Sequence, residues 1–220
     1  MTTTHLLVPV NSLRAGKSRL APVLSDRERR RLNEFFLRRT AGIAKTFPGA
    51  ATTIVVSACD ETLSMAAALG LARMKQAGHG LNAAVKEGVD FLRSKGAHGI
   101  LIIPSDLPLI EAEDLSEIVQ IGEDRYTVVC PDKHRTGTNA IFLAPRASLD
   151  FQFGPGSYAR HIGQAALSGI MPRRHFNAHV ALDIDEPDDI RRWLHDGSSS
   201  QADPVLRLLP ELTADKAARA

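Results

Sequence analysis

The sequence predicts an α/β fold in which helices flank a mixed, mostly parallel sheet. Apolar runs of strand length alternate with amphipathic, helix-like stretches, and the runs are "HLLVPV", "TTIVVSAC", "GILIIPSD", "YTVVCP", "NAIFLAP" and "HVALDID". Two of them, "GILIIPSD" and "YTVVCP", are apolar almost throughout, which is typical of strands covered on both faces. In such sheets ligands bind beyond the carboxyl ends of the strands, so functional residues are expected in the loops that follow the runs.

The helices are predicted from capping signals and apolar periodicity. The first begins at Ser25, because Glu28 three residues later completes a capping box. Further helices are expected over residues 61–69, 81–94, 112–121, 158–167 and 187–195. Residues 1–196 are then a single domain, and residues 197–220, which open with "GSSSQADP", are expected to form a flexible tail.

Composition limits the class of protein. A chain of 220 residues that is 44% hydrophobic has enough apolar material for a proper core. With 27 Lys and Arg against 25 Asp and Glu, no overall field favours nucleic acid. Cys59 and Cys130 lie far apart in apolar runs, which suits buried free thiols in a reducing cytosol. No basic leader or membrane-length apolar window is present, so we expect a soluble cytoplasmic protein; a homodimer is compatible with the sequence.

The segment "VPVNSLRAGKSRLAP" ends in Gly-Lys-Ser, as a phosphate-binding P-loop does. A P-loop also requires a glycine at its start, where this chain has Asn11. In addition, Pro22 would interrupt the helix that must open at Lys17. We therefore reject the P-loop and expect a phosphate site built from the side-chain charges of Arg14, Lys17 and Arg19.

Asp106 follows the buried run "GILIIPSD" and stands between Pro104 and Pro108, which prevent a strand or helix from continuing. A carboxylate held at this point faces the ligand crevice. The alternative is that Asp106 caps the next helix, although Glu111 and Asp114 lie nearer to that helix.

The segment "HVALDIDEPDDI" contains a pair of carboxylates, Asp183 and Asp185, which would face the same side if the segment is a strand. Two such charges at about 4 Å and an effective dielectric near 20 repel by about 4 kcal/mol. A Lys, an Arg or a divalent cation is therefore expected between them, and few hard oxygen ligands suit Mg²⁺ held jointly with substrate phosphates. The alternative is an acidic helix start, a role that we assign to the following acids Glu186, Asp188 and Asp189.

Two further stretches, "RTGTNAIFLAP" and "FQFGPGSYARH", combine glycine with hydroxyl residues. Thr138 and Ser157 can donate to an anionic oxygen, and Ser157 opens a helix whose dipole favours an anion. Either stretch alone is compatible with a simple turn. Together they indicate a second, smaller anion beside the first, and Arg160 and His161 lie one helical turn further on, where they can face the same crevice.

The stretch "QAGHGLNAAVKEG" places a glycine-rich turn before a helix that opens at Leu81 and Asn82. Asn82 either caps this helix or marks a close approach of the backbone to a nucleotide. A basic loop, a strand-end acid and an acid pair are together the parts of metal-dependent nucleotidyl transfer, in which an acceptor oxygen attacks the α-phosphorus of a nucleotide and diphosphate departs.

The motifs "VPVNSLRAGKSRLAP", "GLNAA", "PSDLPL", "GTN", "FGPGSYARH" and "LDIDEPDD" resemble those of the guanylyltransferases of coenzyme F-420 biosynthesis. The resemblance implies a Rossmann-like, GT-A-like nucleotidyltransferase fold related to the molybdopterin guanylyltransferases. It also implies GTP and Mg²⁺ as cosubstrate and cofactor, and an acceptor that is phosphoenolpyruvate, 2-phospho-L-lactate or 3-phospho-D-glycerate.

The resemblance further implies roles for single residues. The acid-binding positions fall on Thr138, Gly154 and Ser157, and the metal-holding positions on Asp106, Asp183 and Asp185. The loop that meets the GTP phosphates contributes Lys17 and Arg19, which with Asp106 are the expected catalytic residues, while Leu81 and Asn82 join Lys17 in nucleotide binding. Asn11 stands where many relatives are expected to carry Lys, which removes one positive charge near the triphosphate.

Two other functions are considered. A molybdopterin or sugar-phosphate nucleotidyltransferase would have several glycines in its first loop, where this chain has only Gly16. A non-catalytic nucleotide-binding regulator would not need all three acids at positions 106, 183 and 185. The identity of the acid, the basis of guanine selectivity and the oligomeric state stay open, because they depend on pocket shape rather than on motifs.

Overall fold

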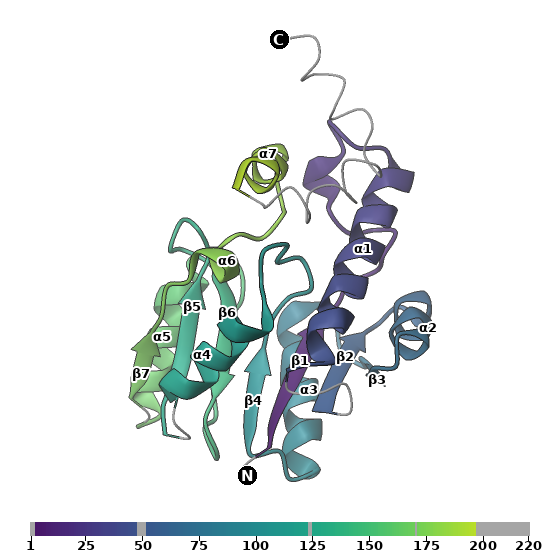
Figure 1. Ribbon diagram of the computed structural model, residues 1–220. Helices are drawn as coiled ribbons and strands as arrows, with labels where there is room; N and C mark the ends of the chain where they lie inside the picture. The colour runs from purple at the N-terminus through teal and green to yellow at the C-terminus, as the bar shows by residue number, and fades with distance from the viewer. Residues whose placement is uncertain (1–2, 48–51, 123–124, 170, 197–220) are drawn as a thin grey trace.

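The computed structural model describes residues 3–47, 52–122, 125–169 and 171–196, and these form a seven-stranded sheet with helices on both faces (Figure 1). The strand order is β3-β2-β1-β4-β6-β5-β7. All adjacent pairs are parallel except those of β6, which runs antiparallel to β4 and β5. The predicted mixed, mostly parallel α/β sheet is thus confirmed. The strands are β1 Thr4–Pro9, β2 Thr53–Ser57, β3 Ala72–Lys75, β4 Gly99–Ile102, β5 Thr127–Pro131, β6 Thr138–Leu143 and β7 Pro172–Arg174.

The five helices predicted after the first begin and end within one residue of their predicted bounds. The capping box of the first is present, since Ser25 Oγ accepts from Glu28 N–H and the Glu28 carboxylate accepts from Ser25 N–H at 2.8 Å. Because this helix starts at Asp26 and not at Lys17, the rejection of a P-loop is confirmed. The helices are the short 3-10 helix η1 Ser18–Leu20, α1 Asp26–Ala44, α2 Asp60–Ala68, α3 Gly80–Ser94, α4 Ala112–Gly122, α5 Ser157–Leu167, α6 Ala178–Ala181 and α7 Pro187–Asp196.

The prediction of a strand over "HVALDID" is wrong. Residues 178–181 form α6, whose start is capped by Asn177: its side chain accepts from the N–H groups of His179 and Val180. The chain then continues to Asp185 without joining the sheet. A short buried apolar run does not by itself distinguish a strand from a helical turn, which explains the error.

The edge strands β3 and β7 were missed because they are short and carry polar or charged residues, "ARMK" and "PRR", instead of an apolar run. Cys130 is buried as expected, whereas Cys59 is only partly buried, and both are free thiols. None of the helices among the described residues is long and apolar enough to cross a membrane. The predicted tail over residues 197–220 lies outside the described residues.

A second, smaller hydrophobic cluster lies apart from the main core and ties the two ends of the domain together. It joins Leu20 of η1 and Phe36 of α1 to Ile184 and to Trp193 of α7. The rings of Phe36 and Trp193 have centroids 5.7 Å apart. In Figure 1, α7 accordingly lies close to the start of α1, beyond the edge of the sheet. This cluster brings the loop after β1 next to the segment around Asp185.

The topology gathers the predicted functional segments at one edge of the sheet. The carboxyl ends of β1, β2 and β4 share this edge, and so does the amino end of β6, because β6 runs in the opposite direction. Strand β1 has β2 on one side and β4 on the other, so the strand order reverses direction at β1. Such a reversal is the topological switch point at which α/β sheets bind ligands. The loop after β1, Asp106 after β4 and Thr138 at the start of β6 therefore lie together.

Candidate active site

A cavity of about 520 Å³ opens at this switch point. Its walls come from the loop after β1, the turn before α3 and the segment after β4. A volume of this size is within the range of small-molecule sites. The predicted residues Lys17, Leu81, Asp106 and Asp185 line it, and Asn11 and Gly16 do so as well.

Lys17 lies between two carboxylates. Its side chain is only 7% exposed, and its ammonium group donates to Asp106 and, at 3.0 Å, to Asp185. Burial would lower the pKa of the Lys17 amine, but the charges of Asp106 and Asp185 outweigh it and raise the pKa. Arg19 reaches the other oxygen of Asp185 at 3.5 Å. The expectation of a cation beside the acid pair thus takes the form of a lysine shared by Asp106 and Asp185.

Asp183 completes a group of three neighbouring carboxylates. The backbone N–H of Ile184 donates to the backbone oxygen of Asp106 at 3.2 Å, and Asn139 Nδ2 donates to Asp183 at 3.3 Å. Burial, followed by the charges of Asp106 and Asp185, raises the pKa of Asp183. The three acids therefore lie near one another, and hydrogen bonds to neighbouring segments hold them instead of the predicted strand.

The carboxylates do not form a ready-made metal site. Among the described residues, no group of three or more His, Cys, Asp or Glu side chains has a metal-binding arrangement. One oxygen, Oδ1 of Asp106, is nevertheless buried without a hydrogen-bond partner in the described chain. The assignment of the three acids to a metal stays a prediction.

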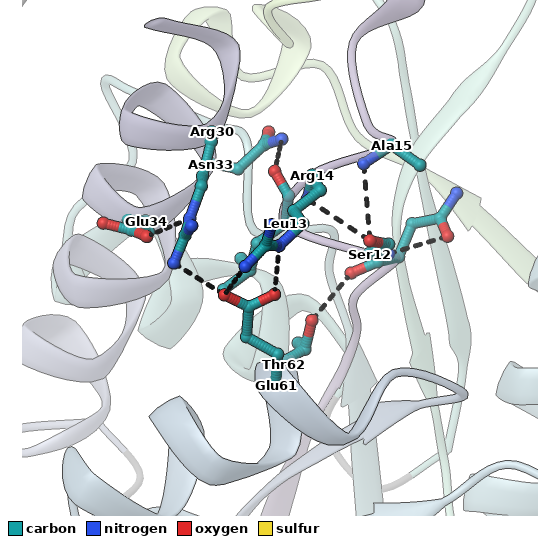
Figure 2. A network of polar contacts seen from close by, with 10 residues as sticks. Ser12, Leu13, Arg14, Ala15, Arg30, Asn33, Glu34, Glu61 and Thr62 are labelled. Atoms are coloured by element: carbon teal, nitrogen blue, oxygen red, sulfur yellow. Dashed lines mark hydrogen bonds and ion pairs between the residues drawn. The ribbon is translucent and has the colours of Figure 1, made fainter. Parts of the chain in front are cut away.

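A polar network holds the loop after β1 (Figure 2). Figure 2 shows the carboxylate of Glu61 between Arg14 and Arg30, at 2.8 Å and 2.6 Å. Asn33 of α1 donates to the backbone oxygen of Leu13 at 2.9 Å. Arg14, expected to join Lys17 in a phosphate site, therefore pairs with Glu61 instead.

Backbone geometry adds to this placement of the loop. A Cβ on Gly16 would lie 2.8 Å from Asn33 Nδ2, so only glycine fits between Lys17 and the helix without displacing that side chain. Lys17 itself adopts a left-handed conformation with φ 63°, which is uncommon for a residue with a side chain. Both features lie in the backbone from which the Lys17 side chain reaches the carboxylates.

The two hydroxyl residues meet next to the carboxylates. Ser157 Oγ donates to Thr138 Oγ1 at 3.1 Å, and His161 Nδ1 lies 3.0 Å from the same Thr138 oxygen. Thr138 directly precedes Asn139, the residue that contacts Asp183. The pair does not line the 520 Å³ cavity.

The glycine-rich turn before α5 has glycine in a left-handed conformation, as anion-binding turns often do, but two of its amides are already used. Gly154 has φ 120°, a conformation open to glycine and rarely adopted by other residues. The N–H of Ser157 donates to Gly154 O and that of Tyr158 to Thr136 O. The donors that remain toward a ligand are therefore the side-chain hydroxyls and the backbone around Gly154. Arg160 is exposed and donates to Gln152 O, away from the hydroxyl pair.

Asn82 does not cap α3. That helix begins at Gly80 after His79, and the side-chain oxygen of Asn82 instead accepts from Phe153 N–H at 2.7 Å. Asn82 thus connects the helix beside the cavity to the turn that carries Gly154. Leu81 lines the cavity as expected.

Three contributors were not anticipated as site residues: Asn33, Glu87 and Asn139. Glu87 accepts from the N–H groups of Ala77 and Gly78 at 2.8 Å and 2.7 Å, and so shapes the turn before α3. Asn139 belongs to the "GTN" motif, so its sequence position could have indicated a role in the site. Asn33 and Glu87 lie in helices, and nothing in the spacing of their neighbours indicates such a role.

The family model described as "Guanylyl transferase CofC like" matches residues 4–216. The chain belongs to this family. A relative from Rubrobacter xylanophilus, named phosphoenolpyruvate guanylyltransferase, is 40% identical over 84% of this chain and 91% of the relative. Another from Methanobrevibacter smithii, named 2-phospho-L-lactate guanylyltransferase, is 28% identical over 95% of this chain and 92% of the relative. The predicted resemblance to the guanylyltransferases is thereby confirmed.

Solved structures confirm the nucleotidyltransferase fold of this CofC-like chain. A putative nucleotide-diphospho-sugar transferase from Desulfovibrio desulfuricans superposes with a TM-score of 0.80 at 16% identity, covering 97% of this chain and 96% of the other. The CMP:2-keto-3-deoxy-manno-octonic acid synthetase gives a TM-score of 0.58 at 13% identity, covering 86% and 96%. At these identities the likeness concerns the fold alone.

Proposed function

We propose that this protein transfers GMP from GTP to a phosphorylated three-carbon acid, with release of diphosphate, in the biosynthesis of coenzyme F-420. The observation that supports it best is the adjacency of two subsites: a nucleotide-sized cavity and a hydroxyl pair, with Asp183 and its neighbouring acids between them. Of the three candidate acceptors we favour phosphoenolpyruvate, the acid named in the relatives at 40% and 37% identity.

In this proposal the cavity takes GTP, and the residues of the loop after β1 meet its phosphates. Lys17 and Arg19 both pair with Asp185, so they would stabilise the negative charge that develops on the departing diphosphate. Leu81 contributes an apolar surface at the cavity wall. Asn82 supports this side of the site through its bond to Phe153.

The acid occupies the second subsite, where Thr138, Ser157 and the backbone at Gly154 receive its phosphate and carboxylate. An oxygen of the acid's phosphate attacks the α-phosphorus of GTP, and the bond from that phosphorus to the β-phosphate oxygen breaks. No side-chain nucleophile takes part. The protein's contribution is to orient the two reactants in line and to surround the reacting phosphates with fixed charges.

The chemistry of the side chains supports a divalent cation of the Mg²⁺ type, although the described residues do not already have a metal-binding arrangement. Asp183 lies close enough to Asp106 and Asp185 to feel their charges, the buried oxygen Oδ1 of Asp106 has no partner in the described chain, and hard oxygen donors are those that Mg²⁺ prefers. Asp106, Asp183 and Asp185 would hold the ion. When bound, it would neutralise charge on the triphosphate during transfer.

The test is diphosphate release from GTP with Mg²⁺, run in parallel with phosphoenolpyruvate, 2-phospho-L-lactate and 3-phospho-D-glycerate, and with ATP and CTP in place of GTP. We expect release with GTP and one acid, phosphoenolpyruvate first. GTP binding without release for any acid would instead support the non-catalytic regulator. Release with sugar phosphates in place of the acids would support a sugar-phosphate transferase of the same fold.

A further inference from the structure

His161 of α5 is a fully buried histidine with both ring nitrogens engaged. Its Nε2 accepts a hydrogen bond from the backbone N–H of Gln152 at 3.0 Å, and its Nδ1 lies 3.0 Å from Thr138 Oγ1. An accepting nitrogen carries no hydrogen, so the neutral ring must have its proton on Nδ1. The contact to the backbone of Gln152 thus selects one tautomer.

The surroundings of His161 favour the neutral form of its ring and pack against the ring. Burial, with a smaller effect from the charge of Arg160, lowers the pKa of His161 to about 4. The ring of Phe153 packs edge-on against it with centroids 4.8 Å apart, and Phe153 in turn stacks on Phe151. These contacts pack the imidazole on the side of Phe153, in the orientation in which Nδ1 lies at Thr138.

The tautomer of His161 determines how the hydroxyl of Thr138 is hydrogen-bonded. In the selected tautomer Nδ1–H donates to Thr138 Oγ1, and Ser157 Oγ donates to the same oxygen. A hydroxyl has two acceptor sites and a single hydrogen, so both acceptor sites of Thr138 are filled from the protein. With Ser157 and His161 as the two donors, the hydrogen of Thr138 is directed at neither of them and is left to point at a ligand.

We infer that His161 is a positioning residue for the acceptor: through its Nδ1–H it holds the Thr138 hydroxyl as a hydrogen-bond donor toward an oxyanion of the phosphorylated acid. This inference rests on the proposed placement of the acid at Thr138 and Ser157. Without the Nδ1–H donor, the Thr138 hydroxyl is free to rotate and to present a lone pair to the anion, which would repel it.

Two isosteric substitutions separate this role from simple packing. In H161N the side-chain nitrogen of Asn can occupy the place of Nδ1 and still donate to Thr138, while the bond to Gln152 is lost. In H161Q the amide reaches the place of Nε2 and can serve Gln152, while the donor to Thr138 is lost. The readouts are kcat, the KM for the acid and the KM for GTP in the diphosphate assay.

We expect H161Q to raise the KM for the acid roughly tenfold, as loss of one hydrogen bond to an anion does, with the KM for GTP unchanged. H161N should recover the acid KM to within about threefold of the wild type on the same scale. In a T138V background, H161Q should have no further effect on the acid KM, because the hydroxyl that it positions is gone.

An H161N that is as impaired as H161Q, or more so, would overturn the inference and assign His161 to holding the turn at Gln152. A wild-type protein that releases diphosphate with none of the acids would overturn the proposed function instead, so the two failures are distinct. Should the variants not fold, ¹⁵N spectra of the wild-type histidines decide: a ring of His161 protonated on Nδ1 supports the inference, and one protonated on Nε2 contradicts it.

Discussion

Lys17 and Asp185 form an ion pair of 3.0 Å although 168 residues separate them in the chain. The apolar neighbours of each explain the contact, since Leu20 and Ile184 belong to one buried cluster with Phe36 and Trp193. Packing of this cluster therefore places a cation among the acids before any substrate arrives. In the proposed reaction the same ammonium group of Lys17 binds the phosphates of GTP.

The first prediction concerns the cations of this loop. K17M should lower kcat for diphosphate release by roughly 100-fold or more, the range seen when a donor to developing charge is removed. R19A should raise the KM for GTP roughly tenfold through loss of a charged hydrogen bond. R191A is the matched control, because Arg191 and Arg19 have similar exposure, 68% and 69%, but Arg191 pairs with Asp188 on α7. An R191A variant as impaired as R19A would contradict the assignment.

The second prediction concerns the carboxylates and the metal. D106N and D183N should each lower turnover by roughly 100-fold, and chelation of Mg²⁺ should abolish it. Without divalent cation, D183N should also melt at a higher temperature than the wild type, because the charges of Asp106 and Asp185 no longer act on a third carboxylate; each kcal/mol relieved raises Tm by about 2–4 °C.

D188N is the control for this set, since Asp188 is an exposed acid of α7 that pairs with Arg191. Its turnover and its melting temperature should match the wild type. Near-normal turnover of D183N at saturating Mg²⁺ would remove Asp183 from the metal-holding acids.

The third prediction concerns the fit of Gly16. In G16A the new Cβ would displace Asn33 from the backbone oxygen of Leu13, so the loop should loosen and the KM for GTP should rise by roughly three- to tenfold, the equivalent of one hydrogen bond. G42A is the matched control, because a Cβ at this position of α1 has no neighbour within 4 Å. Alanine there should leave kinetics unchanged and stabilise the helix slightly. Equal KM values for GTP in both variants would show that the loop does not depend on Asn33.

The fourth prediction is a dependence of stability on pH. The pKa of His161 is lowered from 6.5 to about 4, so below pH 6.5 the unfolded chain binds a proton that the folded chain does not. The free energy of unfolding therefore has its full value, as far as His161 is concerned, above pH 6.5, and it falls as the pH drops toward 4. Urea unfolding of the wild type and H161N across this window should give a smaller loss for H161N. Parallel curves would mean that His161 titrates normally in the fold.

Local rules of sequence account for most of the fold. The Ser25–Glu28 capping box, the buried run at β4 and the position of Asp106 after it were all predicted, because each depends on a few adjacent residues. The strands β3 and β7 were not, since short charged edge strands lack the apolar pattern. Residues 178–181 show the converse, an apolar run that folds as a helical turn because Asn177 caps it.

The site was harder to predict from the sequence, because its contacts join residues that are far apart in the chain. The convergence of Asp183 and Asp185 was expected from a strand that does not exist, whereas the bonds that hold them come from Asp106 and Asn139. The tautomer of His161 depends on the backbone of Gln152, and no spacing rule reports such a contact. Motifs thus identified residue types, and packing decided which of them meet.

The last prediction decides what Asn82 does. Its sequence position suggested nucleotide binding, but its side-chain oxygen accepts from Phe153 N–H at 2.7 Å, and Phe153 lies beside Gly154 and His161. If this bond holds the turn around Gly154 in place, N82A should raise the KM for the acid roughly three- to tenfold and change the KM for GTP little. L81A, in the neighbouring residue that lines the cavity, should do the reverse. A rise in the KM for GTP alone in N82A would show that Asn82 acts in nucleotide binding and would contradict this prediction. A rise in the KM for the acid alone, together with the opposite result for L81A, would show that α3 supports both subsites, through Leu81 on one side and Asn82 on the other.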